Sequence, residues 1–133
     1  MTTGTFYKTV MAASGELDRE RTERAAAAVL HALRDRLTPE EADQVQAQLP
    51  RELKEAWAEG ERTERKPLKM NREEFYARVQ REAALPSPRE ARWMTLAVFG
   101  ALKEQLSSGE AGDVFAQLPK PLKELWLEAL VRA

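Results

Sequence analysis

Apolar residues recur every three to four positions along two long segments of the chain. In residues 88–106 they form a stripe that neighbouring apolar positions widen: Met94, Val98, Leu102 and Leu106, with Leu96, Phe99 and Gly100. In residues 19–37 an alanine-rich stretch precedes a similar stripe of Val29, Leu33 and Leu37. A helix that is apolar over most of its circumference is buried. We therefore expect two long helices at the centre of an all-α fold.

Capping signals delimit further helices before each long one. The pattern predicts a helix over residues 5–14 and another over residues 72–84. Asn71 and Glu74 have the spacing of a capping box, in which each side chain bonds the other residue's backbone N–H. Ser87 stands before a proline at the expected start of the second long helix, so we expect Ser87 to cap that helix.

Two more pairs of helices follow the long ones. Thr38 and Glu41 form a Ser/Thr-x-x-Glu capping box, and Ser107 and Glu110 repeat it. These helices are expected to end near glutamines 48 and 117, where the tripeptide Gln-Leu-Pro follows. Proline is tolerated at the first position of a helix and holds the residue before it in an extended conformation. Each Gln-Leu-Pro therefore predicts a corner, with a closing helix that begins at the proline. Gly60 is the expected residue after the first closing helix.

The second half of the chain repeats the first at an offset of 69 residues. Residues 6–60 align with residues 75–129 without a gap, and 20 of the 55 aligned pairs are identical. So many identities predict an internal duplication. Two copies are too few for a solenoid, so we expect the halves to pack about a pseudo-two-fold axis into one compact helical bundle. The expected organisation is one helical repeat over residues 1–60, a charged linker over 61–74 that runs into the next helix, and a second repeat over 75–133.

Composition and charge narrow the class of protein. The 133 residues include 21 Lys and Arg and 22 Asp and Glu, a formal net charge of −1. Such a balance provides no positive field for nucleic acid or an anionic membrane, so neither is an expected partner. The longest apolar run is far shorter than a membrane span. The excess of Arg over Lys fits a GC-rich genome, and the single Asn fits a heat-adapted source.

The expected compartment is the cytoplasm. The first 18 residues hold one Lys and no apolar segment of the kind that directs secretion. The chain has no Cys, which fits a reducing cytosol. The missing cysteines also exclude disulfides, thiolate catalysis and Cys-bound metal ions.

Motifs for catalysis or cofactor binding do not stand out. His31 is the only histidine, which excludes a two-histidine metal site, and no serine lies in a Gly-x-Ser-x-Gly turn. The six glycines form no phosphate-binding pattern. Several glutamates stand four residues before an arginine, as on solvent-exposed helix faces. We therefore expect no catalytic residue, cofactor or metal ion, and interpret His31 as an ordinary helix residue.

The two halves differ in how apolar their matching positions are. Trp93 stands where the first half has Arg24, and leucines flank Trp126 where alanines flank Trp57. The larger apolar side chains serve either a shared core or a surface that receives a partner helix or a second subunit. The candidate interface residues are Trp93, Phe115, Leu125, Trp126, Leu127 and Leu130.

Two related segments carry a family resemblance. The first reads EEADQVQAQLP at residues 40–50, the second reads GEAGDVFAQLP at residues 109–119, and a Leu and a Trp follow each. With a Phe-Tyr pair near the start of each half and an alanine-rich second helix, this pattern resembles the bacterial domain-of-unknown-function family 2267. The resemblance covers residues 6–60 and 75–129. It implies an all-helical fold and supplies no catalytic or ligand-binding residues.

Two functions from different classes remain open at this point. The first is a non-enzymatic protein-interaction or structural module that binds a partner protein or a second copy of itself. The alternative is a small-ligand binder or an enzyme with a pocket between the halves. A polar pocket that gathers His31, a Glu and an Arg with perturbed pKa values would favour the alternative.

Overall fold

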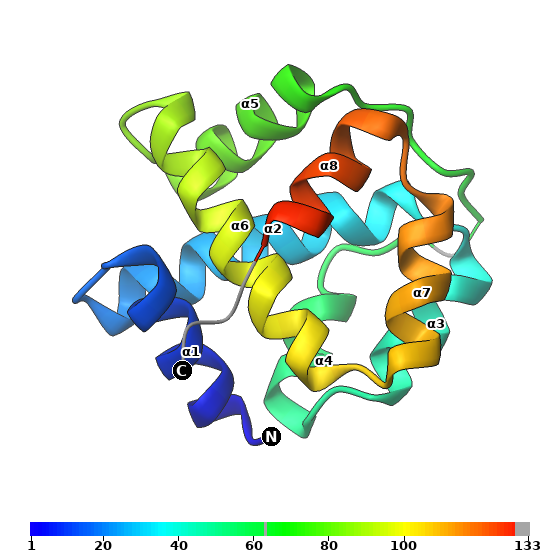
Figure 1. Cartoon of the computed structure of the whole chain (residues 1–133), viewed down its shortest axis with the longest axis horizontal. Helices are drawn as coiled ribbons and strands as arrows, with labels where there is room; N and C mark the ends of the chain where they lie inside the picture. Colours follow the sequence, from blue (N-terminus) through cyan, green and yellow to red (C-terminus); the bar gives the residue numbers. More distant parts are fainter. Residues whose placement is uncertain (63, 130–133) are drawn as a thin grey trace.

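The computed structural model describes residues 1–62 and 64–129, and over these residues the chain is all-helical and has no strand (Figure 1). The helices are α1 Thr3–Ser14, α2 Arg19–Arg36, α3 Pro39–Ala47, α4 Arg51–Ala58, α5 Arg72–Ala83, α6 Pro88–Gln105, α7 Ser108–Gln117 and α8 Lys120–Glu128. The expected all-α class is confirmed, and each helix begins within two residues of its expected start. Within the described ranges, no helix is both long enough and apolar enough to cross a bilayer.

α2 and α6 lie at the centre of one hydrophobic core that runs through both halves, as the apolar stripes predict (Figure 1). α1 of the first half packs mainly on α6 of the second, and α5 of the second half packs mainly on α2 of the first. The ring of Phe99 on α6 lies 5.9 Å from that of Phe75 and 5.2 Å from that of Trp126, measured between centroids. The halves are therefore interlocked, because each supplies a cover for the other's central helix.

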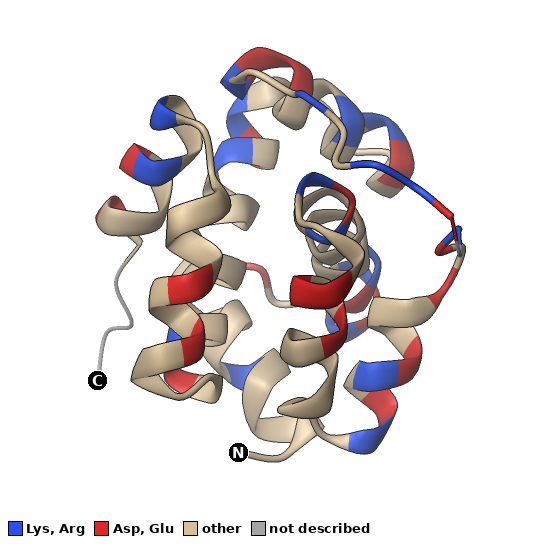
Figure 2. Cartoon of the chain, turned by 90° about the vertical axis from the view of Figure 1, so that its right-hand side faces the viewer, with Lys and Arg blue, Asp and Glu red and all other residues tan. Residues whose placement is uncertain are grey.

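Charged residues of both signs are interspersed along the helices (Figure 2). Two cations have a more specific place, because each bonds backbone carbonyls that a helix end leaves unpaired. Arg34 on α2 donates through Nη1 to two carbonyls at the end of α4, both at 2.7 Å. Lys103 on α6 donates to two carbonyls at the end of α8, at 2.7 and 2.8 Å. Each closing helix is thus tied to the central helix of its own half.

Most of the caps expected at the end of α4 and at the starts of α5 and α6 are present. We call the segment between α4 and α5 the connecting segment. The Asn71 side chain accepts from the N–H of Glu74 at 2.8 Å, and the Glu74 carboxylate accepts from the N–H of Asn71 at 3.0 Å, which confirms the capping box. Gly60 follows α4 with a φ of 74°, as expected for a residue after a helix end. Ser87 precedes α6, but its hydroxyl donates to the carboxylate of Glu90 and makes no cap bond to the backbone. The expected Ser87 cap bond is therefore wrong.

The capping boxes expected for α3 and α7 form only by half. Thr38 accepts from the N–H of Glu41 at 3.2 Å, but the N–H of Thr38 itself donates to Oε1 of Gln117, at 2.9 Å. The same exchange occurs 69 residues later, where the N–H of Ser107 donates to Oε1 of Gln48 at 2.8 Å. A glutamine from the opposite half thus replaces the local glutamate at each cap. This exchange joins α3 to α7 and leaves both cap glutamates without their usual partner.

Both Gln-Leu-Pro corners bury their leucine. Leu49 and Leu118 are 4% and 3% exposed, and Leu118 has the extended conformation expected before proline, with φ −82° and ψ 143°. Each proline occupies the cap position, one residue before the helix begins. The helices of the second half all begin 69 residues after those of the first. The pseudo-two-fold axis itself and the division at residues 61–74 stay predictions.

The corner generates a first prediction. Leu118→Ala is expected to lower the free energy of unfolding by about 2–4 kcal/mol, because it removes buried atoms and leaves a cavity. Pro119→Ala should cost less than about 1 kcal/mol, because alanine fits a helix start and packing also holds the bend. Urea unfolding of both variants, with Leu49→Ala and Pro50→Ala as the matched pair, measures the difference. A larger cost for either proline change would contradict this role of the buried leucines.

The end of α5 generates a second prediction. Ala84 has a φ of 54°, and among the described residues it is the only one besides glycine with a positive φ. Gly15 holds the matching place after α1, with a φ of 80°. A residue with a Cβ costs about 1–2 kcal/mol in the left-handed region. Glycine avoids this steric cost, but it loses more conformational entropy on folding, so the net gain is smaller. Ala84→Gly is therefore expected to raise the free energy of unfolding by about 0.5–1 kcal/mol in urea, and Ala77→Gly on the exposed face of α5 should lower it.

Candidate functional site

The candidate interface residues fall into exposed, half-buried and buried groups. Trp93 and Leu127 are exposed, at 44% and 64%, Phe115 is half-buried, and Leu125 and Trp126 are buried. Leu130 lies outside the described residues. Because α8 rests on α6, its buried residues serve the core of this chain. Of the described candidates, Trp93 and Leu127 offer the most surface to a partner.

Trp93 stands at the rim of a hollow of about 500 Å³, which we call the Trp93 hollow. The ends of α1 and α5 and the first two turns of α2 and α6 form it. Its lining residues are Ser14, Gly15, Glu16, Arg21, Arg24, Ala25, Ala83, Ala84, Leu85, Pro86, Glu90, Trp93 and Met94. Every lining residue of the first half has its counterpart 69 positions later in the same lining. The hollow therefore lies between matching parts of the two halves, and Arg24 and Trp93 are counterparts within it.

The Trp93 hollow combines an apolar floor with a charged rim. Ala25 and Met94 are buried in its floor, at 1% and 6% exposed. The guanidinium of Arg89 lies 4.6 Å from the centroid of the Trp93 ring, a cation–π contact that holds the indole in place. An apolar floor beside a fixed aromatic ring suits an apolar side chain of a partner.

The charges at the rim differ in how far they are already paired. The Glu16 carboxylate accepts from the backbone N–H of the two residues after it, at 3.1 and 3.0 Å. The Glu90 carboxylate accepts from the hydroxyl of Ser87, which contributes to holding the pKa of Glu90 below its usual value. Within the described part of the chain, no hydrogen bond or ion pair involves the guanidinium of Arg21 or Arg24. The hollow therefore offers two exposed cations to a ligand, whereas its carboxylates are occupied.

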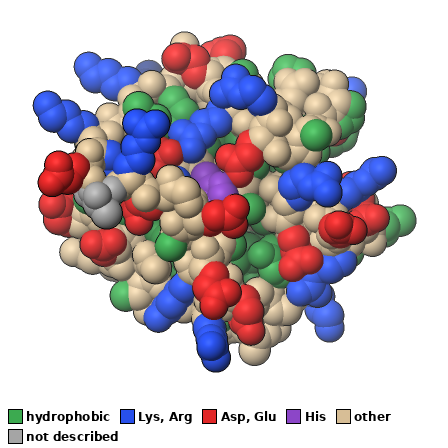
Figure 3. Space-filling view, turned by 180° about the vertical axis from the view of Figure 1, so that it is seen from behind, with side chains coloured by type: hydrophobic (Ala, Val, Ile, Leu, Met, Phe, Trp, Pro, Cys, Tyr) green, Lys and Arg blue, Asp and Glu red, His purple; other side chains and the backbone are tan. Residues whose placement is uncertain are grey.

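A second cleft, of about 790 Å³, lies between α2, α5 and the segment that joins α4 to α5. Figure 3 shows the histidine there among acidic and basic side chains. Nδ1 of His31 lies 2.6 Å from Oε2 of Glu82, and Nε2 lies 2.7 Å from the carbonyl oxygen of Ala56. A carboxylate and a carbonyl both accept, so each ring nitrogen faces an acceptor of the chain. Both nitrogens of His31 are therefore already engaged within the chain.

Asp35 is the centre of the ion pairs in this polar cleft. Its carboxylate accepts from Nε of Arg34 at 2.9 Å and from Nη2 of Arg78 at 2.5 Å, and Nε of Arg65 lies 3.9 Å away. Burial alone would raise the pKa of Asp35, but the hydrogen bonds and charges of Arg34 and Arg78 outweigh it, so the pKa lies below its usual value. The cleft thus joins α2 to α5 through a fully paired carboxylate.

The connecting segment closes the cleft through further bonds to α2. Arg65 donates to the carbonyl oxygens of Leu37 and Arg34, at 2.6 and 2.9 Å, and the N–H of Leu68 donates to the carbonyl of Asp35 at 2.8 Å. These bonds reach the carbonyls at the C-terminal end of α2, where the Arg34 carbonyl also accepts from the N–H of Leu37. The polar cleft does gather a His, a Glu and Args, as the alternative function requires. Its hydrogen-bonding capacity, however, is used within the chain.

Comparison with known families gives one match. The model of a family described as "Uncharacterized conserved protein (DUF2267)" matches residues 3–125. The match runs from the start of α1 into α8 and stops before the last residues of α8. The match bears out the resemblance seen in the two Gln-Leu-Pro segments. No curated protein matches the chain.

The ion pairs of Asp35 generate a third prediction. Asp35→Asn is expected to lower the free energy of unfolding at pH 7 by about 2 kcal/mol, because Arg34 and Arg78 lose a charged acceptor. A carboxyl whose pKa is lower in the folded chain stabilises it above the unfolded pKa, and that stabilisation is lost as the pH falls through the folded pKa. The difference between wild type and variant should therefore shrink between pH 5 and pH 3 in urea titrations.

The exposed Asp43 on α3 provides the matched control. Asp43→Asn should change the free energy of unfolding by less than about 0.5 kcal/mol at either pH. An Asp35→Asn variant that is equally destabilised at pH 7 and pH 3 would show that the charge of Asp35 is not what stabilises the cleft.

Proposed function

The chain belongs to the DUF2267 family, and from its structure we propose that it is a non-enzymatic protein-interaction module whose binding site is the Trp93 hollow. The observation that carries the proposal is a half-exposed tryptophan beside two exposed arginines, with which no described carboxylate pairs, around an apolar floor. The partner that fits this chemistry is an amphipathic segment with one apolar anchor side chain and carboxylates beside it.

The apolar part of the site supports a protein partner. Trp93 keeps 44% of its surface exposed although Arg89 holds its ring in place. Tryptophan and arginine are the residues that most often carry binding energy at protein interfaces. Burying an aromatic side chain contributes about 1.5–3 kcal/mol, so covering the exposed part of Trp93 provides a useful share of a binding free energy.

The charged part of the site supports an acidic partner. Arg21 and Arg24 are exposed, and among the residues that the structure describes no carboxylate pairs with either guanidinium. The two glutamates of the rim are occupied by backbone N–H groups and by Ser87. Carboxylates on a partner would therefore meet unpaired guanidinium groups, which steers association and fixes the register of the bound segment.

The alternative of an enzyme or small-ligand binder at the polar cleft has weaker support. Both ring nitrogens of His31 are engaged within the chain, and Asp35 is paired with arginines. A general base needs a free lone pair within reach of the substrate proton. The polar cleft is therefore better explained as the joint between α2, α5 and the connecting segment.

A display library of amphipathic helical peptides, varied at one apolar and two acidic positions, tests the proposal. We expect selected binders to carry an apolar anchor next to Asp or Glu. Trp93→Ala should weaken the best peptide at least about tenfold, and Arg24→Gln should weaken it about fivefold with a smaller salt dependence. Fluorescence polarisation of the labelled peptide measures both changes.

Leu127→Ala is the matched control, because Leu127 is also a large exposed apolar residue but does not line the hollow. It should leave the peptide affinity within about twofold. Peptides that bind Trp93→Ala as tightly as wild type, or selected sequences without acidic residues, would contradict the proposal. A dimer that dissociates on dilution and is lost in Trp93→Ala would instead identify a second copy as the occupant.

A further inference from the structure

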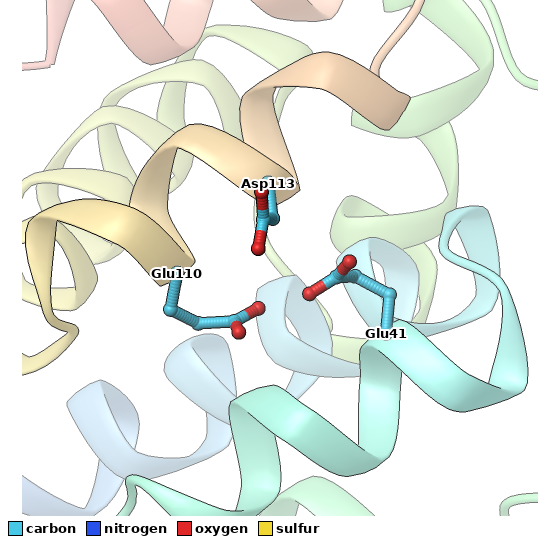
Figure 4. Close-up of side chains that lie close together, drawn as sticks. All are labelled: Glu41, Glu110 and Asp113. Carbon is cyan, nitrogen blue, oxygen red and sulfur yellow. The ribbon is translucent and has the colours of Figure 1, made fainter.

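Glu41 and Glu110 face each other where α3 meets α7, with Asp113 beside them (Figure 4). Glu41 and Glu110 are 8% and 6% exposed, so both are more than nine-tenths buried, whereas Asp113 is exposed. One carboxylate oxygen from each of the three residues lies within 4.8 Å of the others. Three acidic groups of two helices thus converge on one small volume.

The cap exchange explains why these glutamates point inward. In a complete capping box the glutamate accepts from the backbone N–H of the cap residue. Here the N–H of Thr38 donates to Gln117 and the N–H of Ser107 donates to Gln48. The carboxylates of the two boxes are released from the helix starts and turn toward each other.

Neither buried carboxylate is satisfied by its surroundings. Oε2 of Glu41 and Oε2 of Glu110 have no hydrogen-bond partner in the described part of the chain. Oε1 of Glu41 accepts only a long bond from Nε2 of Gln117, at 3.4 Å. No lysine or arginine among the described residues forms an ion pair with Glu41, Glu110 or Asp113. Burying unpaired negative charge is strongly unfavourable, so a positive species has to be supplied to this contact.

We propose that Glu41, Glu110 and Asp113 bind a hard divalent cation such as Ca²⁺, which joins α3 to α7. Ca²⁺ takes oxygen ligands at about 2.4 Å, so two ligands on opposite sides of the ion are about 4.8 Å apart. The three oxygens lie within 4.8 Å of one another, so small side-chain movements bring all three to one ion. An all-carboxylate set favours Ca²⁺, Mg²⁺ or Mn²⁺ over zinc. The exposed side of Asp113 leaves room for the waters that complete the coordination shell.

A proton is the competing positive species. Burial, then a proton that Glu110 can share with Glu41 and the charges of Glu41 and Asp113, raise the pKa of Glu110 to about 8. The cation therefore displaces a proton from Glu110 near neutral pH, and its affinity rises between pH 6 and pH 8. An acid whose pKa is raised in the folded chain destabilises it as the pH rises above the unfolded pKa. The cation-free chain should accordingly lose stability over the same pH range.

Calorimetric titration of the EDTA-treated chain with Ca²⁺, Mg²⁺ and Mn²⁺ tests the site. We expect saturable binding of about one ion per chain, tighter at pH 8 than at pH 6, with about one proton released per ion in buffers of different ionisation enthalpy. Binding should raise the melting temperature, because only the folded chain brings the three carboxylates together.

Three variants separate the cation site from a structural effect. Glu110→Gln keeps the shape and removes the charge, so it should weaken binding at least about tenfold and raise the melting temperature of the cation-free chain at pH 8. Because Asp113 is exposed, Asp113→Asn should leave the fold intact, and it should weaken binding about three- to tenfold. Asp43→Asn, an exposed change on α3, should alter neither. If millimolar Ca²⁺, Mg²⁺ and Mn²⁺ all leave the wild-type melt unchanged at pH 8 and give no binding heat, a shared proton alone satisfies the pair and the proposal is overturned.

Discussion

The fold depends on the need of two apolar helices to be covered on more than one side. α2 and α6 carry apolar residues over most of their circumference, and one neighbour cannot remove so much surface from water. α1 covers α6 and α5 covers α2, so each half lends its first helix to the other. The remaining contacts follow from this exchange. The Trp93 hollow lies where the exchanged helices α1 and α5 end and where α2 and α6 begin, and α3 meets α7 on another part of the same boundary.

Two polar contacts between the halves show opposite ways of burying charge. In the polar cleft, Asp35 meets Arg34 and Arg78, and His31 lies between a carboxylate and a carbonyl, so donors and acceptors balance. At the α3–α7 contact, Glu41 and Glu110 meet as two acceptors without a donor between them. A balanced network stabilises the joint it spans. An unbalanced one is stable only with an added proton or cation, which makes its stability respond to the solution.

The sequence predicts the helices well because their signals are local. The apolar stripes identify α2 and α6, and proline places the corners within one residue. The cap of α3 was half wrong because a glutamine 79 residues away along the chain bonds the N–H of Thr38. The sequence also offers no reason to expect that Glu41 and Glu110 converge, because a capping box already accounts for a glutamate at each position. The exchange of Arg24 for Trp93 is visible in the sequence, but only the fold brings both residues to one hollow.

The packing of each half's first helix on the other half also has a consequence for assembly. Each half contributes to the contacts that hold the other, whereas the connecting segment crosses the outside and bonds mainly to the end of α2. Covalent continuity between α4 and α5 is therefore not what positions the helices. A half-length polypeptide could close the same contacts with a second copy as a symmetric dimer, because an interface in which each side offers the same surfaces is self-complementary. Joining two such halves in one chain removes the dependence of the assembly on protein concentration, and it allows a position in one half, such as Trp93, to differ from its counterpart in the other.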